Sequence, residues 1–427
     1  ILYHPYDLKT FIDEKFKTEK EGLVLEALDG ESEILIEGFI KGREFSCIVA
    51  QDEHGIPVAL PPTEIKKGTE LFDYRSKYLP GLSRKITPID LPEEQIETIR
   101  KECERLFTAF NFDVYARIDG FITADNNIYL NDPNTTSGMM PSSFFFHHAA
   151  EIGLNPSQFL TYIIRTSLKQ RIARGGKNLS YQNLLDKLDS AIKVNTETRS
   201  EKIKIAVILG GYSSERHISV ESGRNIYEKL SSSEKYVPFP VFLTGNDEAH
   251  ELYLIPVNVL LKDNADDIKE KVHHYKQHPI IKKIIAEASS ITTKYVGENA
   301  LFVPRKISYQ ELAQMADGVF IALHGRPGED GALQKELENV GLPYNGSGQE
   351  SSSITINKYK TNEILKQHGM LVAEHTILTK QEWESSKEQA LSRIKSQFKF
   401  PFIAKPVDDG CSSAVKKIKT EEEFIAF

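Results

Sequence analysis

Apolar and polar positions alternate in ways that divide the chain into two folded stretches. In the first, residues 5–16 have helical spacing, the apolar run EILIEGFI (33–40) predicts a buried strand, and EFSCIVA (44–50) alternates as a second strand does. Residues 91–110 start at a proline and repeat apolar side chains every three or four positions, which predicts an amphipathic helix. Helices and strands are mixed from the start, which indicates an α/β protein.

The first stretch ends in a hairpin and a helix. YARIDGFIT and NIYLND are two strands joined by ADNN, a sequence typical of a tight turn. A helix predicted from about 156 to 171 closes the stretch. Residues 173–202 are polar around one modest helix, so we expect a linker there.

The second stretch opens at residue 203 with an apolar strand, a glycine turn and a helix, as nucleotide-type α/β domains do. DGVFIALHG (317–325) is another buried strand that ends in a loop, and FPFIAKP (400–406) is a third. Between the first two strands lie residues 235–310, which we interpret as an insert without an assigned role.

The composition is that of an ordinary soluble globular protein. The 427 residues are 40% hydrophobic and 27% charged, and the net charge of −8 gives no general attraction to nucleic acid or to an anionic membrane. No apolar run reaches the length that spans a membrane. Cys47, Cys103 and Cys411 lie far apart, which excludes a disulfide framework and suits a reducing cytoplasm. Because the chain starts at Ile1 without Met and stops at Phe427 within a helical pattern, we expect both ends to be cut.

The predicted hairpin carries the first candidate chemistry. Asp119 lies in its first strand, and Asp132 and Asn134 end its second. Three oxygen donors on neighbouring strands suit a hard cation such as Mg²⁺, although surface acids of a hairpin give the same pattern. Protein-bound Mg²⁺ usually accompanies a nucleotide phosphate, and no phosphate-cradling sequence occurs in the first 170 residues.

Sequences suited to phosphates and small substrates occur in the second stretch. LGGYSSERHIS places Glu215 in a glycine turn, where a carboxylate could bind a substrate ammonium, and a plain strand-to-helix turn is the alternative. ALHGRPGEDGALQ (322–334) gathers glycines, acids, an arginine and a histidine at a strand end. Lys405 ends a strand before a glycine and hydroxyl loop, so it is either a phosphate contact or a solvated lysine. In the first stretch, Glu37 could accept from an adenine amine or a ribose hydroxyl.

Eight sequences together resemble the D-alanine–D-alanine ligases of the ATP-grasp superfamily. They are GGYSSERHISVESG, LHGRPGEDGALQ, GLPYNGSG, KP followed by DGCSS, LIEGFIKGREF, FDYRSKY, RID and NDPNTTSGM. The resemblance implies an α/β ATP-grasp fold with a Rossmann-like N-terminal-type domain. It is rotated, because the family's C-terminal part, which binds nucleotide and Mg²⁺, comes first, at residues 1–172.

After the linker at 173–202, the rotated order implies a Rossmann-like substrate domain at 203–350 and the start of the ATP-grasp central domain at 351–427. Two arrangements would give this order. One is a window cut from a tandem of two ligase modules, and the other is a circular permutant, which close family termini would permit. The absent Met and the overlapping patterns of the two ends favour the window.

The resemblance also implies roles for individual residues. Those at the ATP phosphates are Lys358, Lys405 and Lys77, and those at the adenine and ribose are Glu37, Phe39 and Glu44. Those that would bind two Mg²⁺ ions, with Mn²⁺ as the alternative metal, are Asp119, Asp132 and Asn134. Those at the first D-alanine are Glu215 and His324, and those at the second are Gly138 and Ser143. Arg117 would stabilise the transition state. Tyr78, Ser412 and Glu215 would form the hydrogen-bonded latch that joins the closing loop to the site.

The implied function is ATP-dependent joining of two D-alanine molecules through an acyl phosphate, for the bacterial cell wall. Asp132 stands where the family usually has glutamate, and Ser137 replaces its usual proline, so the second substrate stays open. The alternatives are a related ligase with another amino or hydroxy acid acceptor, and a catalytically weak nucleotide-binding or regulatory module. We expect a cytoplasmic protein that binds ATP and D-alanine. Its protein partner would be a second copy in a homodimer or another module of a tandem.

Overall fold

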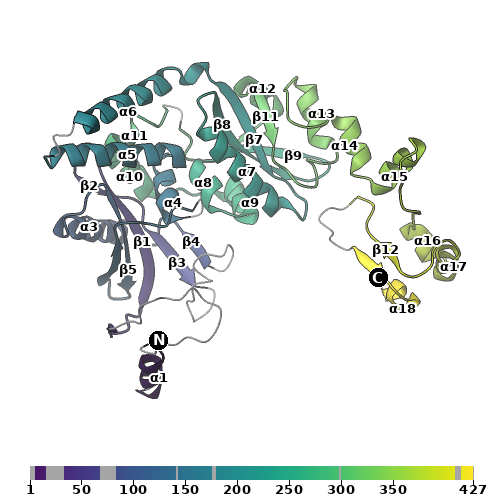
Figure 1. The fold of residues 1–427 in the computed structure, drawn as a ribbon, viewed down its shortest axis with the longest axis horizontal. Coiled ribbons are helices and arrows are strands. Elements are labelled where there is room, and N and C mark those ends of the chain that lie inside the picture. Colours follow the sequence, from purple (N-terminus) through teal and green to yellow (C-terminus); the bar gives the residue numbers. More distant parts are fainter. Residues whose placement is uncertain are drawn as a thin grey trace.

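The computed structural model describes residues 5–15, 33–67, 83–140, 143–175, 179–297, 300–408 and 415–426. Its strands form three sheets that follow one another along the longest axis of the molecule (Figure 1). We call the surrounding parts the first lobe (residues 33–175), the second lobe (residues 203–347) and the third lobe (residues 349–426). The architecture is mixed α/β, as predicted, while the domain limits given above stay predictions.

The first lobe is built on an antiparallel sheet with strand order β4-β3-β1-β5-β6, and β2 pairs with β1. Its strands are β1 (Gly42–Gln51), β2 (Pro57–Ala59), β3 (Thr63–Lys67), β4 (Ser83–Ile86), β5 (Tyr115–Thr123) and β6 (Ile128–Asn134). Its helices are α3 (Glu93–Ala109), α4 (Phe144–Glu151) and α5 (Pro156–Ala173), and the separate helix α1 (Pro5–Lys15) precedes the lobe. The helix predicted at 5–16, the strand at 44–50, the hairpin and the helix at 156–171 are confirmed.

Helix α3 shows how the apolar spacing positions this sheet. Pro92 precedes its first turn, and one face buries Ile96, Ile99, Cys103 and Phe107. Each such side chain stabilises the fold by about 1.5–3 kcal/mol relative to exposure, so the stripe holds the helix on the sheet that carries β5. The prediction of an amphipathic helix within 91–110 is confirmed.

The second lobe has a five-stranded sheet with order β10-β9-β8-β7-β11, in which β7 lies parallel to β8 and β11. Its strands are β7 (Ile203–Gly210), β8 (Tyr236–Gly245), β9 (His250–Leu254), β10 (Arg305–Ile307) and β11 (Gly318–Ile321). Its helices are α7 (Arg216–Ser231), α8 (Val257–Lys262), α9 (Ala265–His274), α10 (Pro279–Glu287), α11 (Ser289–Thr292), α12 (Tyr309–Met315) and α13 (Ala332–Asn339). The strand, turn and helix predicted from residue 203 and the strand within 317–325 are confirmed.

The segment 235–310, interpreted above as an insert, is an integral part of this sheet. It supplies β8, β9 and β10 as well as helices α8 to α11. The polar, helix-like sequence after residue 262 hid this role, because the strands on either side of it are short or contain prolines.

Helices α8, α10 and α11 join the two lobes. Leu261, Ile284 and Ile291 belong to the same buried apolar cluster as Phe145 and Phe159 of the first lobe. One continuous core therefore crosses the boundary, which fixes the first lobe and the second lobe relative to each other.

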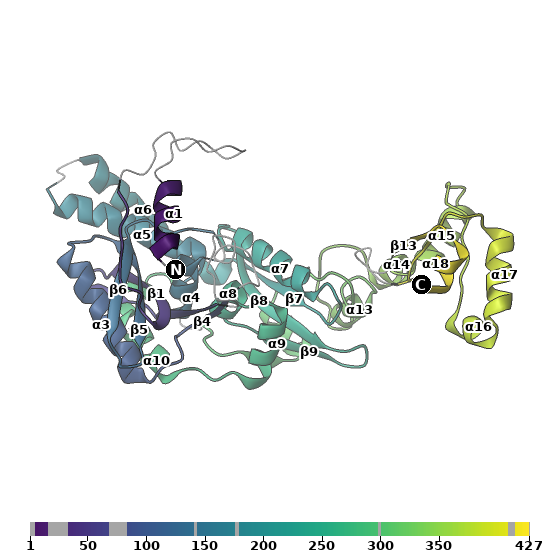
Figure 2. The same cartoon turned by 90° about the horizontal axis from the view of Figure 1, so that it is seen from below.

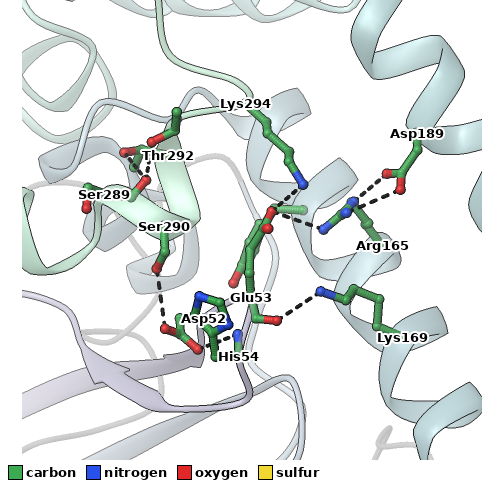
Figure 3. A network of polar contacts seen from close by, with 12 residues as sticks. Asp52, Glu53, His54, Arg165, Lys169, Asp189, Ser289, Ser290, Thr292 and Lys294 are labelled. Atoms are coloured by element: carbon green, nitrogen blue, oxygen red, sulfur yellow. Dashed lines mark hydrogen bonds and ion pairs between the residues drawn. The ribbon is translucent and has the colours of Figure 1, made fainter.

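A polar network covers one side of this junction (Figure 3). The carboxylate of Glu53, in the turn after β1, lies 2.7 Å from Lys294 Nζ and 3.2 Å from an Nη atom of Arg165 on α5. Arg165 also donates to Asp189, and Lys169 Nζ donates to the Glu53 carbonyl at 2.9 Å. Asp189 lies on α6 (Leu179–Glu197), so most of the predicted linker is a helix packed against α5 (Figure 1) rather than a loose connection.

The third lobe is small and lies at the far end of the molecule (Figure 2). Its elements are α14 (Gln349–Thr355), which leads into it, α15 (Lys358–Gln367), α16 (Lys380–Ser385), α17 (Lys387–Gln397), β12 (Phe402–Ala404), β13 (Lys416–Ile418) and α18 (Glu421–Ala426). The two strands pair antiparallel over a core around Ile394, Ile418 and Phe424. The strand predicted within 400–406 is confirmed. None of the described helices is long and apolar enough to span a membrane.

One predicted strand is wrong. Residues 33–40 form neither strand nor helix, and Leu35 and Phe39 are 81% and 72% exposed. A strand forms only where another strand offers backbone donors and acceptors, and no described strand pairs with this segment. An apolar run predicts burial, but it does not say where a pairing strand lies.

Candidate active-site residues in three places

The glycine turn of the second lobe brings Glu215 and His324 together. Glu215 is the residue before helix α7, and its side chain is buried. Ser213 Oγ accepts from the Glu215 N–H at 3.1 Å and donates to the His324 carbonyl at 2.9 Å. On α7, Ser219 Oγ accepts from the His324 N–H at 2.9 Å, and Ser222 Oγ lies 2.9 Å from His324 Nε2. Ser213 therefore links the backbones of Glu215 and His324, while Ser219 holds the His324 backbone and Ser222 contacts its imidazole.

Glycine is required where this turn meets the next loop. Gly325 has φ +67°, and a Cβ placed there would lie 2.7 Å from Ser213 Oγ and 3.1 Å from a carboxylate oxygen of Glu215. A side chain at 325 would push both groups out of place. The glycine-rich sequence at 322–334 thus has a steric reason as well as a chemical one.

Strand β5 carries the second group of charged residues. Alternation along the strand puts Arg117 and Asp119 on one face, where their side chains are each 18% exposed and lie 3.1 Å apart. Ser46 on β1 is directly opposite Asp119 and donates its hydroxyl proton to Asp119 Oδ1 at 2.7 Å. The Arg117 Nε is buried and has no hydrogen-bond partner among the described residues. A buried guanidinium nitrogen in that state is suited to an anionic ligand.

The end of β6 places the other predicted metal ligands beside this pair. Asn134 is opposite Arg117, and the register shifts between Ile118 and Asp119, which leaves Asp132 at φ +46°. Asn134 Nδ2 donates to the Asp132 carbonyl at 2.6 Å, which fixes the amide and directs its oxygen away from that carbonyl. A carboxylate in the middle of β5, and a carboxylate and an amide oxygen at the end of the adjacent β6, are ligand types that suit Mg²⁺.

This donor set does not enclose a metal by itself. The described residues contain no group of three or more His, Cys, Asp or Glu side chains that could hold an ion. Magnesium usually keeps waters and takes phosphate oxygens as ligands, so one or two carboxylates suit it better than a closed protein site.

Lys358 and Lys405 line one cavity of about 730 Å³ between the second lobe and the third lobe. Gly328, Gly346 and Ser347 line the same space. This volume suits a small-molecule ligand, and the two ammonium groups give it an anionic preference. The Lys358 N–H donates to the Val407 carbonyl at 2.8 Å, which ties α15 to the loop after β12.

The second-substrate residues lie before helix α4. Ser143 precedes the helix, and its Oγ is buried without a hydrogen-bond partner among the described residues. Gly138 has an open surrounding, with no described atom within 4 Å of an added Cβ. Lys85 on β4 lies nearby, with its Nζ 4.7 Å from the centre of the Phe144 ring, and burial lowers its pKa to about 8. The sequence reasoning missed this residue. The only signal for it was a lysine on the inward face of the short strand SRKI.

The remaining predicted residues are placed in part. Glu37 and Phe39 lie exposed in the segment that forms no strand, so the structure gives them no ligand-facing position. Glu44 lies half-buried on β1 opposite Phe121. Lys77, Tyr78 and Ser412 lie outside the described residues.

The charged groups of the first lobe and of the third lobe do not meet. Strand β5, with Asp119, and strand β12, which ends just before Lys405, stand far apart in Figure 1, and in Figure 2 β5 is likewise far from β13, the strand paired with β12. The second lobe lies between them. Within one chain, Asp119 and Lys405 therefore do not face each other across a cleft.

The mixed α/β lobes, with an arginine–aspartate pair on one strand and a carboxylate at a glycine turn, agree with the ATP-grasp class of folds. A sequence profile described as D-ala D-ala ligase C-terminus matches residues 15–165 and 364–427, and one described as D-ala D-ala ligase N-terminus matches residues 204–347. The chain belongs to the D-alanine–D-alanine ligase family. Most of the family's C-terminal part precedes its N-terminal part here, so the predicted rotation is confirmed.

Individual relatives match only partly. The D-alanine–D-alanine ligase of Natranaerobius thermophilus is 29% identical over 225 residues, which are 53% of this chain and 55% of that protein. That of Clostridium botulinum is 35% identical over 160 residues, 38% of this chain and 51% of that protein. Among solved structures, the ligase from Bacillus anthracis complexed with ATP is 29% identical with a TM-score of 0.32, covering 41% of this chain and 51% of that one. The chain thus spans about half the length of the curated relatives it matches.

Proposed function

We propose that this chain acts as an ATP-dependent ligase that joins two D-alanine molecules through an acyl phosphate, for peptidoglycan precursor synthesis in the cytoplasm. The observation that carries the proposal is the Arg117–Asp119 pair, held by Ser46 and by the Asn134 turn at the end of a β-hairpin. Family membership supports the reaction class.

The chain's own residues would divide the work between binding and charge stabilisation. Lys358 and Lys405 would neutralise ATP phosphates in the cavity that they line. Glu215, buried beside His324, would bind the ammonium of the first D-alanine and orient its carboxylate. Arg117 would stabilise the charge that develops as that carboxylate takes the phosphoryl group. These are positioning and electrostatic roles, and none needs a covalent enzyme intermediate.

The metal-binding role falls to Asp119, Asp132 and Asn134. Mg²⁺ or Mn²⁺ held by these residues would neutralise part of the phosphate charge. Asp132 is one methylene shorter than glutamate, so we expect weaker metal binding there than a glutamate would give. Ser143, whose hydroxyl lacks a partner among the described residues, would bind the second D-alanine with Gly138.

A second candidate function is nucleotide binding without turnover by a regulatory module. The observation that favours it is the separation of β5 from β12 in Figures 1 and 2, because a ligase needs both sets of charges at one nucleotide. A related ligase with another acceptor is the third candidate, on account of Asp132 and Ser137.

One assay distinguishes these candidates. The full chain is incubated with ATP, Mg²⁺ and D-alanine, and both phosphate release and dipeptide are measured, the latter by mass spectrometry. We expect release that depends on D-alanine and a D-alanyl-D-alanine product, and L-alanine serves as the control substrate. ATP binding without release over a wide range of protein concentration would support the regulatory module, and a product only with another acceptor would support the third candidate.

A further inference from the structure

We propose that Lys85 binds the carboxylate of the second substrate, and that the reaction therefore requires an acceptor with a free carboxylate. The inference rests on the proposed ligase function and deepens it, because it adds a specificity-determining residue on the acceptor side of the site. In the proposed function that side is formed by Gly138 and Ser143, and neither of these residues carries a charge.

Strand register places Lys85 on the same face of the sheet as Asp119. Asp119 on β5 pairs with Ser46 on β1, and Ser46 pairs with Thr63 on β3. Residues that pair in an antiparallel sheet point to the same side, so Asp119 and Thr63 share a face. The next residue of β3 on that face is Ile65, which pairs with Lys85 on β4. The ammonium of Lys85 and the carboxylate of Asp119 therefore belong to one surface of the first lobe.

Helix α4 covers this surface and brings the acceptor residues to Lys85. His148 Nε2 on α4 lies 2.7 Å from Thr63 Oγ1, which joins the helix to the face of the sheet. At the first turn of the helix, Lys85 Nζ lies over the Phe144 ring, 4.7 Å from its centre. Ser143 directly precedes Phe144, so the ammonium and the Ser143 hydroxyl lie beside the same turn of the chain.

Two features of this place suit a carboxylate. Ser143 Oγ is buried and has no hydrogen-bond partner among the described residues, so its hydroxyl can donate to an oxygen of a ligand. A buried ammonium is stabilised by an anion beside it, through a charge-assisted hydrogen bond. Burial lowers the pKa of Lys85 to about 8, and a bound carboxylate would raise that pKa again.

The charged groups on the elements around Lys85 are mostly paired with each other. The ionisable side chains there are Glu44 on β1, Arg117 and Asp119 on β5, His147, His148 and Glu151 on α4, and Lys262 on α8. Lys262 lies 2.7 Å from Glu151, and Arg117 lies 3.1 Å from Asp119, so these charges balance in pairs. Burial lowers the pKa of both histidines, which keeps them neutral. The carboxylate on β1 is two strands away from β4, with β3 between them.

Competition between two acceptors tests the proposal. The full chain is incubated with ATP, Mg²⁺ and equal concentrations of D-alanine and D-alaninamide, which has nearly the same shape without the carboxylate. D-alanine is the acyl donor for both products, and mass spectrometry separates D-alanyl-D-alanine from D-alanyl-D-alaninamide. We expect the wild-type chain to prefer D-alanine. Lys85→Met should reduce that preference by about 10–100-fold, as expected for loss of one hydrogen bond to a charged group, and should leave the KM for ATP unchanged.

The matched control is Lys85→Arg, which keeps the positive charge and should retain most of the preference. A preference that Lys85→Met leaves unchanged overturns the proposal, as does an equal loss of both products, which would indicate a structural role. Lys85→Arg as damaging as Lys85→Met also overturns it, because the lysine would then act by proton transfer rather than by its charge.

A binding measurement tests the same contact without turnover. Calorimetry of D-alanine binding with Mg²⁺ and a non-hydrolysable ATP analogue at pH 8.5, in two buffers with different heats of ionisation, counts the protons taken up. With a pKa of about 8, about a quarter of Lys85 is protonated at that pH, and contact with a carboxylate would protonate nearly all of it. The wild-type chain should therefore take up about 0.7 proton more than Lys85→Arg. Equal uptake overturns the proposal, whereas the expected difference without any turnover refutes the proposed ligase function alone.

Discussion

The ion pair between Glu151 and Lys262 gives the sharpest test of how the first lobe and the second lobe are held together. Glu151 ends α4 and Lys262 ends α8, and their side chains are 3% and 5% exposed. Lys262 Nζ lies 2.7 Å from Glu151 Oε1, and Asn258 Nδ2 donates to the other carboxylate oxygen at 2.8 Å. Burial lowers the pKa of the Lys262 ammonium, but the carboxylates of Glu151 and Asp263 together raise it by more, so this pKa lies above its ordinary value.

Lys262→Met removes the cation and leaves a buried carboxylate with one amide donor. Removal of one partner of a buried ion pair typically costs about 3–5 kcal/mol, because the remaining charge stays out of water without compensation. The Glu151→Gln, Lys262→Met double variant has no buried charge left, so we expect it to regain most of that loss.

Urea unfolding followed by far-ultraviolet circular dichroism measures these free energies. The matched control is Lys283→Met, because the Lys283 side chain is 49% exposed and its Nζ lies 3.1 Å from Glu97, and we expect a change of about 0–1 kcal/mol there. A Lys262→Met variant no less stable than the control, or a double variant no better than the single one, would refute the reasoning. In the first case the junction would rest on its apolar core alone.

Three further predictions concern local features. Burial, and then Lys262 and Lys85, lower the pKa of His148 from 6.5 to about 3. As the pH falls, the His148 imidazole is therefore protonated in the unfolded chain before it is protonated in the folded one. The free energy of unfolding, measured with urea, should fall by about 3 kcal/mol between about pH 7 and pH 4. Gly325→Ala should lower the free energy of unfolding by about 1–3 kcal/mol and should also weaken D-alanine binding, measured by calorimetry. Its control is Gly341→Ala, which should affect only stability, because Gly341 has φ +70° and no described atom within 4 Å of an added Cβ. Ile99→Ala, fully buried, should cost about 2–5 kcal/mol in the same unfolding assay.

The sequence predicted well the elements whose partners are close along the chain. The hairpin of β5 and β6 is joined by four residues, and α3 needs only its own apolar stripe and a nearby sheet. The strand, turn and helix at β7 and α7 form one local unit, and the motif there placed Glu215 near His324 correctly.

The site could be predicted residue by residue only where hydrogen bonds within one lobe fix it. Arg117, Asp119 and Asn134 share a face because strand alternation and pairing put them there. Ser46, which supports Asp119, was missed because it comes from a strand 73 positions away, and a serine in an alternating strand has no distinctive pattern. Lys85 was missed for the same reason.

What motifs cannot give is the distance between lobes, and the failure at residues 33–40 shows why. An apolar run predicts burial, but it does not say which strand will pair with it. Among the described residues this run is exposed, and β12 and β13 form a two-stranded sheet in the third lobe. The order of motifs along the chain likewise does not fix the distance between β5 and β12, because that distance depends on how the second lobe packs between them.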